Sequence, residues 1–247
     1  SLGKITEAIE AYEKEIKISK QEDESLLRQT AIASMLPLRS DMRDQIRGAT
    51  YTALKEIDSD NVVEYLEEGL ADESGMIRAL VAEALGKRKA GQRSKRFRES
   101  LKDEAGLVRA TVLIGLGQSG DKSLVSMIEP SLTDEQHLVQ IAAARALYEL
   151  GQKQYWARLE QGAKSEEGYE RGAAIRAFGE LEDPRAIPIL EKTISDNQPS
   201  IRAAAIASLG KLKAPESLPT LKAALFDRIP AVRSVAAFSM GYFEQHQ

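Results

Sequence analysis

The sequence predicts an all-α fold, a right-handed α-solenoid of about seven two-helix repeats with a capping helix at the N-terminus. Three observations predict it. The same residue types recur every 31 residues from position 41 to position 241 without an insertion. Apolar residues inside each repeat follow helical spacing, and no segment alternates with period two. The composition is 43% hydrophobic and only 5% aromatic, and it is rich in the residues that favour helix.

The period is most visible in a column of arginines, each preceded six positions earlier by an aspartate. Numbered from the N-terminus, repeats one, two, three, six and seven keep both residues. Their pairs are Asp41 and Arg47, Asp72 and Arg78, Asp103 and Arg109, Asp196 and Arg202, and Asp227 and Arg233. In repeat four Gln140 replaces the arginine, and in repeat five Ser165 replaces the aspartate. A charge pair repeated in this way is expected to stabilise the stacking of repeats, within one repeat or between neighbours.

Each repeat reads as two helices, and repeat six shows the pattern most clearly. The first helix is expected over residues 184–195, with Asp183 as its N-cap and Pro184 at its first position. The second is expected over residues 198–212, again with a proline, Pro199, near its start. Since one helix pair cannot bury its own apolar face, the repeats are expected to stack, each on its neighbours.

The motif D-x-x-x-x-[IV]-R-x-x-A-x-x-[AS]-L-G, seen complete in DNQPSIRAAAIASLG, resembles the short HEAT-like repeats of the phycobilin-lyase type. The stretch DESGMIRALVAEALG follows it with one valine for alanine. The resemblance covers about residues 23 to 243 and implies an open helical superhelix. Repeat five departs most, with Ser165, Gly168, Tyr169 and Glu170 at columns that elsewhere hold other residues.

The N-terminal segment KITEAIEAYEKEIKIS lies outside the repeat columns. Its apolar residues, Ile5, Ile9, Tyr12 and Ile16, mark an amphipathic helix. We therefore expect an N-terminal capping helix in residues 1–22 and the solenoid in residues 23–247. The stretch AIEAYEKEIKI is also similar to the second helix of a tetratricopeptide repeat, so an upstream region of that type stays an alternative.

Bulk composition excludes several classes of function. The net charge of −4 gives no global argument for nucleic acid or for an anionic membrane, and no apolar run is long enough to span a bilayer. The absence of cysteine excludes disulfides, thiolate metal sites and cysteine nucleophiles. A cytoplasmic location is favoured, and a bacterial periplasm stays open because the chain begins Ser1-Leu2-Gly3 and a signal peptide is not excluded.

No catalytic residue, metal site or cofactor is predicted. The string GLGQSG matches a dinucleotide-binding pattern, but it follows a helix rather than a strand, so its glycines are expected to serve packing and a turn. Neither His137 nor His246 has a metal ligand at the usual spacing. HEAT-like hydroxylases that bind iron use His–Glu pairs, and the sequence contains no such pair.

A local excess of positive charge lies in KRKAGQRSKRFR, at the turn before the first helix of repeat three. Its basic residues are Lys87, Arg88, Lys89, Arg93, Lys95, Arg96 and Arg98. Such a cluster can contact phosphates or an acidic protein, or can be solvated surface.

The exposed side of the second helices is expected to line a concave groove. Columns not used for packing place there an apolar strip bordered by charges, which is typical of a site for a peptide or helix. The residues expected to contact a partner are Met76, Leu80, Leu107, Ile114, Leu138, Ile141, Tyr169, Arg145 and Arg176. Burial of some of them against neighbouring repeats is the alternative. Trp156 and Tyr155 lie on a first helix and are expected to pack in the core.

The function expected from these features is that of a monomeric, non-enzymatic scaffold or adaptor, which holds a partner helix or extended segment. A phycobilin-lyase-type enzyme or chaperone subunit, implied by the resemblance alone, is the first alternative. Nucleic-acid binding through residues 87–98 is the second.

Overall fold

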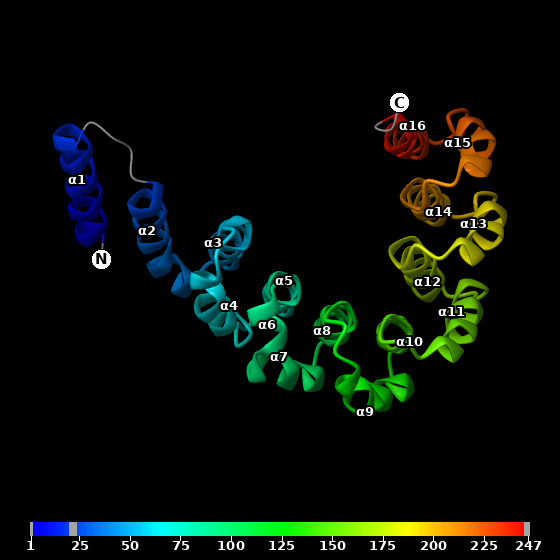
Figure 1. The fold of residues 1–247 in the computed structure, drawn as a ribbon, viewed down its shortest axis with the longest axis horizontal. Coiled ribbons are helices and arrows are strands. Elements are labelled where there is room, and N and C mark those ends of the chain that lie inside the picture. The colour runs from blue at the N-terminus through cyan, green and yellow to red at the C-terminus, as the bar shows by residue number, and fades with distance from the viewer. Residues whose placement is uncertain (1, 20–23, 245–247) are drawn as a thin grey trace. The chain divides into compact units, whose positions relative to one another are not determined.

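The computed structural model describes residues 2–19 and 24–244, and every regular element in these residues is a helix (Figure 1). The predicted all-α repeat fold is therefore confirmed. Contacts divide the chain into two compact units, Ser1–Gly115 and Leu116–Gln247, here called unit 1 and unit 2. The domain boundary predicted at residue 22 falls outside the described residues and stays a prediction. No helix in the described ranges combines the length and apolar character needed to cross a membrane.

Unit 1 begins with α1, which packs against α2 and leaves Ile9 and Ile18 exposed. Its helices are α1 (Leu2–Ser19), α2 (Glu24–Met35), α3 (Asp44–Glu56), α4 (Val63–Gly69), α5 (Gly75–Gly86), α6 (Lys89–Arg93) and α7 (Lys95–Glu99). Helix α8 (Gly106–Gln118) starts in unit 1 and ends in unit 2.

Unit 2 alternates short first helices with long second helices. Its helices are α9 (Val125–Ile128), α10 (His137–Glu149), α11 (Trp156–Ala163), α12 (Gly168–Leu181), α13 (Ile187–Thr193), α14 (Pro199–Leu212), α15 (Leu218–Ala224) and α16 (Pro230–Glu244). The second helices α10, α12, α14 and α16 lie side by side in one layer, and the first helices form the other (Figure 1).

The first helices differ from the prediction, because most open with a 3-10 turn. In repeat six the turn covers Pro184–Ala186 and α13 begins only at Ile187. Pro188 explains the late start: it has no N–H, so it is tolerated only in the first turn of an α-helix. The side chain of Asp183 accepts a hydrogen bond from the N–H of Arg185, which confirms its role as the cap.

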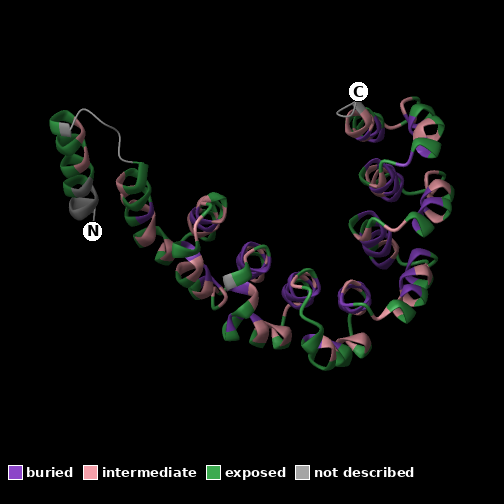
Figure 2. Ribbon diagram, viewed as in Figure 1, coloured by how far each residue is buried: buried purple, intermediate pink, exposed green. Residues whose placement is uncertain are grey.

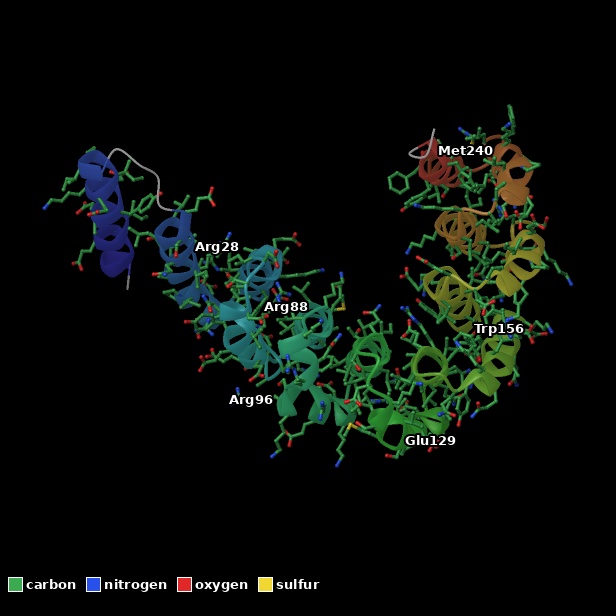
Figure 3. The ribbon with its side chains drawn as sticks, viewed as in Figure 1. Arg28, Arg88, Arg96, Glu129, Trp156 and Met240 are labelled. Carbon is green, nitrogen blue, oxygen red and sulfur yellow. The ribbon has the colours of Figure 1, made fainter. Side chains whose placement is uncertain are left out.

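The core of unit 2 is formed where second helices face first helices, and buried residues gather there (purple in Figure 2). Leu147, Phe178 and Leu209 occupy one column of successive repeats and are fully buried. Trp156, labelled in Figure 3, is also buried, as predicted, and its ring lies 4.8 Å from that of Phe178. Burial of side chains of this size stabilises the fold by about 1.5–3 kcal/mol each.

A glycine column lets the second helices approach closely. A Cβ atom on Gly179 of α12 would lie 2.7 Å from the Cα of Ser208 on α14. The glycines of GLGQSG serve packing and a turn. Gly115 faces the backbone of Gly86, and Gly120 has a φ of 70° in the turn that follows α8.

Arg47, Arg78, Arg171 and Arg202 each join their own repeat to the next one, and this series of contacts is here called the ladder. Nη1 of Arg202 donates to the carbonyl oxygen of Asp196 in the same repeat, at 2.9 Å. Its Nε and Nη2 donate to the carboxylate of Asp227 in the following repeat, at 2.7 and 2.9 Å. Asp227 also accepts from the N–H of Ile229 at the start of the next helix. The pairing is thus between repeats, and in these four links the arginine reaches an aspartate 25 residues further along the chain.

Acid is expected to weaken the ladder. The hydrogen bonds from Arg202 hold the pKa of Asp227 at about 2, whereas an unfolded aspartate titrates near about 3.9. Between these two pKa values the unfolded chain binds more protons than the folded one. The contribution of the Arg202–Asp227 pair to the free energy of unfolding is therefore present above about pH 4 and is lost as pH falls towards 2. The urea midpoint should therefore fall steeply in this window. The urea midpoint of Asp227→Asn should fall less steeply than that of the parent protein. If both midpoints depend on pH in the same way, the ladder is not the cause.

Candidate interaction surface

The term second-helix surface is used here for the side of the second helices that faces away from the first helices. In unit 1 it exposes Met76 on α5 and Leu107 on α8, which are 70% and 40% accessible. Leu80 and Ile114, on the same two helices, are half-buried. Unit 1 therefore presents an apolar patch led by Met76.

In unit 2 the second-helix surface exposes aromatic side chains. Tyr169 at the start of α12 is 91% accessible, and Phe238 on α16 is 71% accessible. The ring of Phe238 meets that of Tyr242 edge to face, with centroids 5.6 Å apart. Helix α14 lies between α12 and α16, and its outward residues, Ser200, Ala203 and Ala207, are all small. Two prominent aromatic residues thus flank a low helix face.

One guanidinium on this surface is without a counterion. Arg176 is exposed on α12, two turns after Tyr169, and no group among the described residues accepts a hydrogen bond from it. Desolvation lowers the pKa of Arg176. The adjacent Glu180 is already paired with Lys211. A carboxylate brought by a partner would therefore find a free, partly desolvated guanidinium here.

Two residues predicted to contact a partner are instead buried, and these two predictions are wrong. Ile141 is 2% accessible, because its side chain packs against Gly162 of α11 in the next repeat. Arg145 is 7% accessible and pairs with Glu149 one turn later, at 3.2 Å. Leu138 is half-buried against the core of unit 2. Column analysis did not select Phe238, although it stands in the same column as Arg176.

Most of the basic side chains in residues 87–98 make contacts within unit 1. Nη2 of Arg88 donates to the carbonyl oxygens of Lys55 and Ile57, at 2.7 and 2.9 Å, and so closes the end of α3 (Figure 3). Lys87 pairs with Glu83 at 2.6 Å. The remaining contacts are Arg93 to the carbonyl of Lys89, Arg98 to the carbonyl of Gln92, and Lys95 to Glu99. The side chains of Lys89 and Arg96 have no partner among the described residues. Since only Lys87 and Lys95 pair with carboxylates, and the arginines donate to neutral carbonyls, most of the positive charge of the segment is not neutralised by these contacts. Nucleic-acid binding stays a prediction.

The departures in repeats four and five meet at one place. Nε2 of Gln140 keeps the contact within its repeat, to the carbonyl of Asp134 at 2.7 Å. Ser165 has no carboxylate to extend the ladder, and a different network stands there. Nη2 of Arg158 donates to Oε1 of Glu170 at 2.7 Å and to Gln140 at 2.9 Å. Glu170 is 7% accessible in a column that holds isoleucine or valine in every other repeat.

The junction between repeats four and five, where the arginine–aspartate pair is replaced by Gln140 and Ser165, is here called the altered rung. A histidine and two glutamates also lie there. Nδ1 of His137, at the start of α10, lies 3.2 Å from Oε2 of Glu167 and 3.3 Å from Oε2 of Glu170, both at the start of α12. The three ligand atoms lie within 4.8 Å of one another. The cluster could not be recognised from the sequence, because Glu167 and Glu170 are 30 and 33 residues from His137. The available signal was the paired loss of arginine at 140 and aspartate at 165.

The fold and its repeated surface define an α-solenoid repeat protein, and the chain belongs to the HEAT repeat family. The family model described as HEAT repeats matches residues 94–171 and 157–241, which together are more than half of the chain. No curated protein sequence matches this chain.

Among solved structures, the chain is similar to the complex of CpcE and CpcF of phycocyanin lyase from a Nostoc species. Identity is 17%, the TM-score is 0.58, and the match covers 87% of this chain and 94% of that one. It is also similar to human deoxyhypusine hydroxylase, with 16% identity, a TM-score of 0.45 and coverage of 90% and 99%. At these identities the first likeness shows the fold alone, and the second is too distant to support any argument.

Proposed function

We propose that this HEAT repeat chain is a non-enzymatic scaffold that binds a protein partner, as a helix or an extended segment, through its second-helix surface. The observation that supports this most is the exposure of Tyr169 and Phe238 in unit 2. Aromatic and arginine side chains are enriched at the centres of protein interfaces. Single exposed apolar residues need no explanation, but here they stand on repeats five and seven, on either side of the small outward residues of α14, and the unpaired Arg176 lies two turns after Tyr169 on α12.

The same surface offers a distinct patch in unit 1. Met76 and Leu107 occupy the column that holds Tyr169 in unit 2, so one helix position supplies the exposed residue in each of these repeats. Repeat proteins bind extended partners through such repeated positions. Each unit is proposed to make its own contacts, and each is tested by its own substitution.

The test is recovery of proteins from an extract of the source organism on the immobilised chain. Tyr169→Glu and Leu107→Glu should each lower recovery of a specific partner by about tenfold or more, since a charge at an interface centre is costly. Phe226→Glu is the matched control, because Phe226 is 88% accessible but lies in the turn between α15 and α16. If all variants recover the same proteins as the parent, the surface is not the binding site.

The lyase-type alternative depends on the resemblance and on the likeness of fold, and no described side chain favours it over a scaffold. It differs from the scaffold in one measurable respect. A lyase-type chain should change the absorption spectrum of an added bilin, whereas a scaffold that binds only protein should leave the spectrum unchanged.

A further inference from the structure

The altered rung between repeats four and five is more than a missing ion pair. Elsewhere in unit 2 an arginine links neighbouring repeats, as Arg171 does with Asp196 and Arg202 with Asp227. Between α10 and α12 the two charged partners are both replaced, and His137, Glu167 and Glu170 converge from opposite sides of the same junction. The repeat pattern explains none of these three residues.

The spacing of these atoms is close to the separation of two ligands bound to one metal ion. Charge-assisted N–H···O contacts are typically about 2.7–2.9 Å long, and both contacts of His137 are longer, at 3.2 and 3.3 Å. Two ligands that each lie about 2.1 Å from a tetrahedral zinc ion are about 3.4 Å apart. The imidazole nitrogen and each carboxylate oxygen already stand near that separation, so a small inward shift of Glu167 would complete a three-ligand set.

The surroundings hold one ligand in place. Glu170 is more than nine-tenths buried, and its Oε1 is fixed by Arg158, which leaves Oε2 directed at His137. Hydrogen bonds from outer residues commonly orient metal ligands in this way. His137 and Glu167 are 46% and 66% accessible, so the set is open to solvent on one side, where water can complete the coordination.

The same surroundings argue against hard cations. Arg158 and the N-terminal ends of α10 and α12 all contribute positive potential. An ion held by charge alone, such as Mg²⁺ or Ca²⁺, would be disfavoured, whereas an ion with affinity for imidazole gains from His137.

We propose that His137, Glu167 and Glu170 bind a divalent transition-metal ion of the Zn²⁺ class. The ion would link repeat four to repeat five where the arginine–aspartate pair is absent.

The first experiment needs no variant. The chain has two histidines and no cysteine, so a long-range ¹H–¹⁵N spectrum of the whole protein contains two imidazole rings. Titration with ZnCl₂ should shift one ring, that of His137, with saturation at one ion per chain, and MgCl₂ should shift neither. If both rings respond alike, or neither does, the proposal is overturned.

The second experiment assigns the ligands by calorimetric titration with ZnCl₂. His137→Ala and the isosteric Glu167→Gln should each weaken binding by about tenfold or more. His246→Ala and Glu166→Gln, which change the other histidine and a neighbouring carboxylate, should bind as the parent does. Zinc should raise the melting temperature of the parent but not of His137→Ala, because an ion that binds only the folded state stabilises it. Equal affinity of His137→Ala and the parent would sink the proposal.

Discussion

Replacing Arg78 with alanine is expected to lower the free energy of unfolding by about 3–5 kcal/mol. Its side chain is only 8% accessible and donates to the carboxylate of Asp103 at 2.8 and 2.9 Å. It also donates to the carbonyl of Asp72 at 2.8 Å. Truncation would leave Asp103, itself 10% accessible, as a nearly buried carboxylate without its arginine. Urea denaturation of the two proteins under matched conditions measures the difference.

The protein supplies its own comparison for this change. Arg78→Gln should lose less stability than Arg78→Ala, because Gln140 in repeat four shows that glutamine keeps the bond to the carbonyl of its own repeat. The difference between the variants separates the bond within the repeat from the link between repeats. Arg96→Ala, at an exposed arginine without a described partner, should change stability by less than about 0.5 kcal/mol. A loss at Arg78 no larger than that at Arg96 would contradict the role assigned to the ladder.

Gly179→Ala is expected to destabilise unit 2 by about 1–3 kcal/mol. The added Cβ would lie 2.7 Å from both the Cα and the Cβ of Ser208. Since Ser208 is buried and its hydroxyl is bonded to the carbonyl of Ile175, α14 would have to move away from α12. This cost outweighs the gain of about 0.5–1 kcal/mol that alanine normally brings to a helix interior in place of glycine.

Gly241→Ala is the matched control, and its expected effect has the opposite sign. Gly241 occupies the same column of the repeat as Gly179, two repeats later, but nothing lies within 4 Å of its added Cβ. Only the helix preference remains, so a gain of up to about 1 kcal/mol is expected. Thermal unfolding of both variants measures the contrast, and a shift in the same direction for both would show that close packing does not set the sign at position 179.

The repeat architecture could be predicted from the sequence because the same residue pattern recurs in successive repeats. The arginine column holds in six of seven repeats and the leucine column in five, and such columns fix the period, the helix pairs and the residues that face the core. Leu147, Phe178 and Leu209 are buried as their common column requires. The caps follow from local chemistry as well, since the bond from Arg185 to Asp183 depends on residues two apart.

Relations between repeats could not be predicted in the same way. Whether Ile141 faces outward or packs on Gly162 depends on the rotation from one repeat to the next, which no column encodes. The approach of His137 to Glu170 depends on the same rotation. The sequence marked repeats four and five as irregular, but only the folded structure shows that their irregularities face each other.

Repeats four and five have consequently lost the interchangeability that makes modular proteins easy to lengthen or shorten. Excision of the 31 residues of repeat six would bring Arg171 opposite Asp227, so an arginine–aspartate pair could form at the new junction. Excision of repeat five would remove Arg171 and bring Gln140 opposite Asp196. The carboxylate of Asp196 would then have no arginine partner. Repeat six can be shuffled as a unit, whereas repeat five is tied to the repeat before it and can be inherited, or engineered, only together with that neighbour.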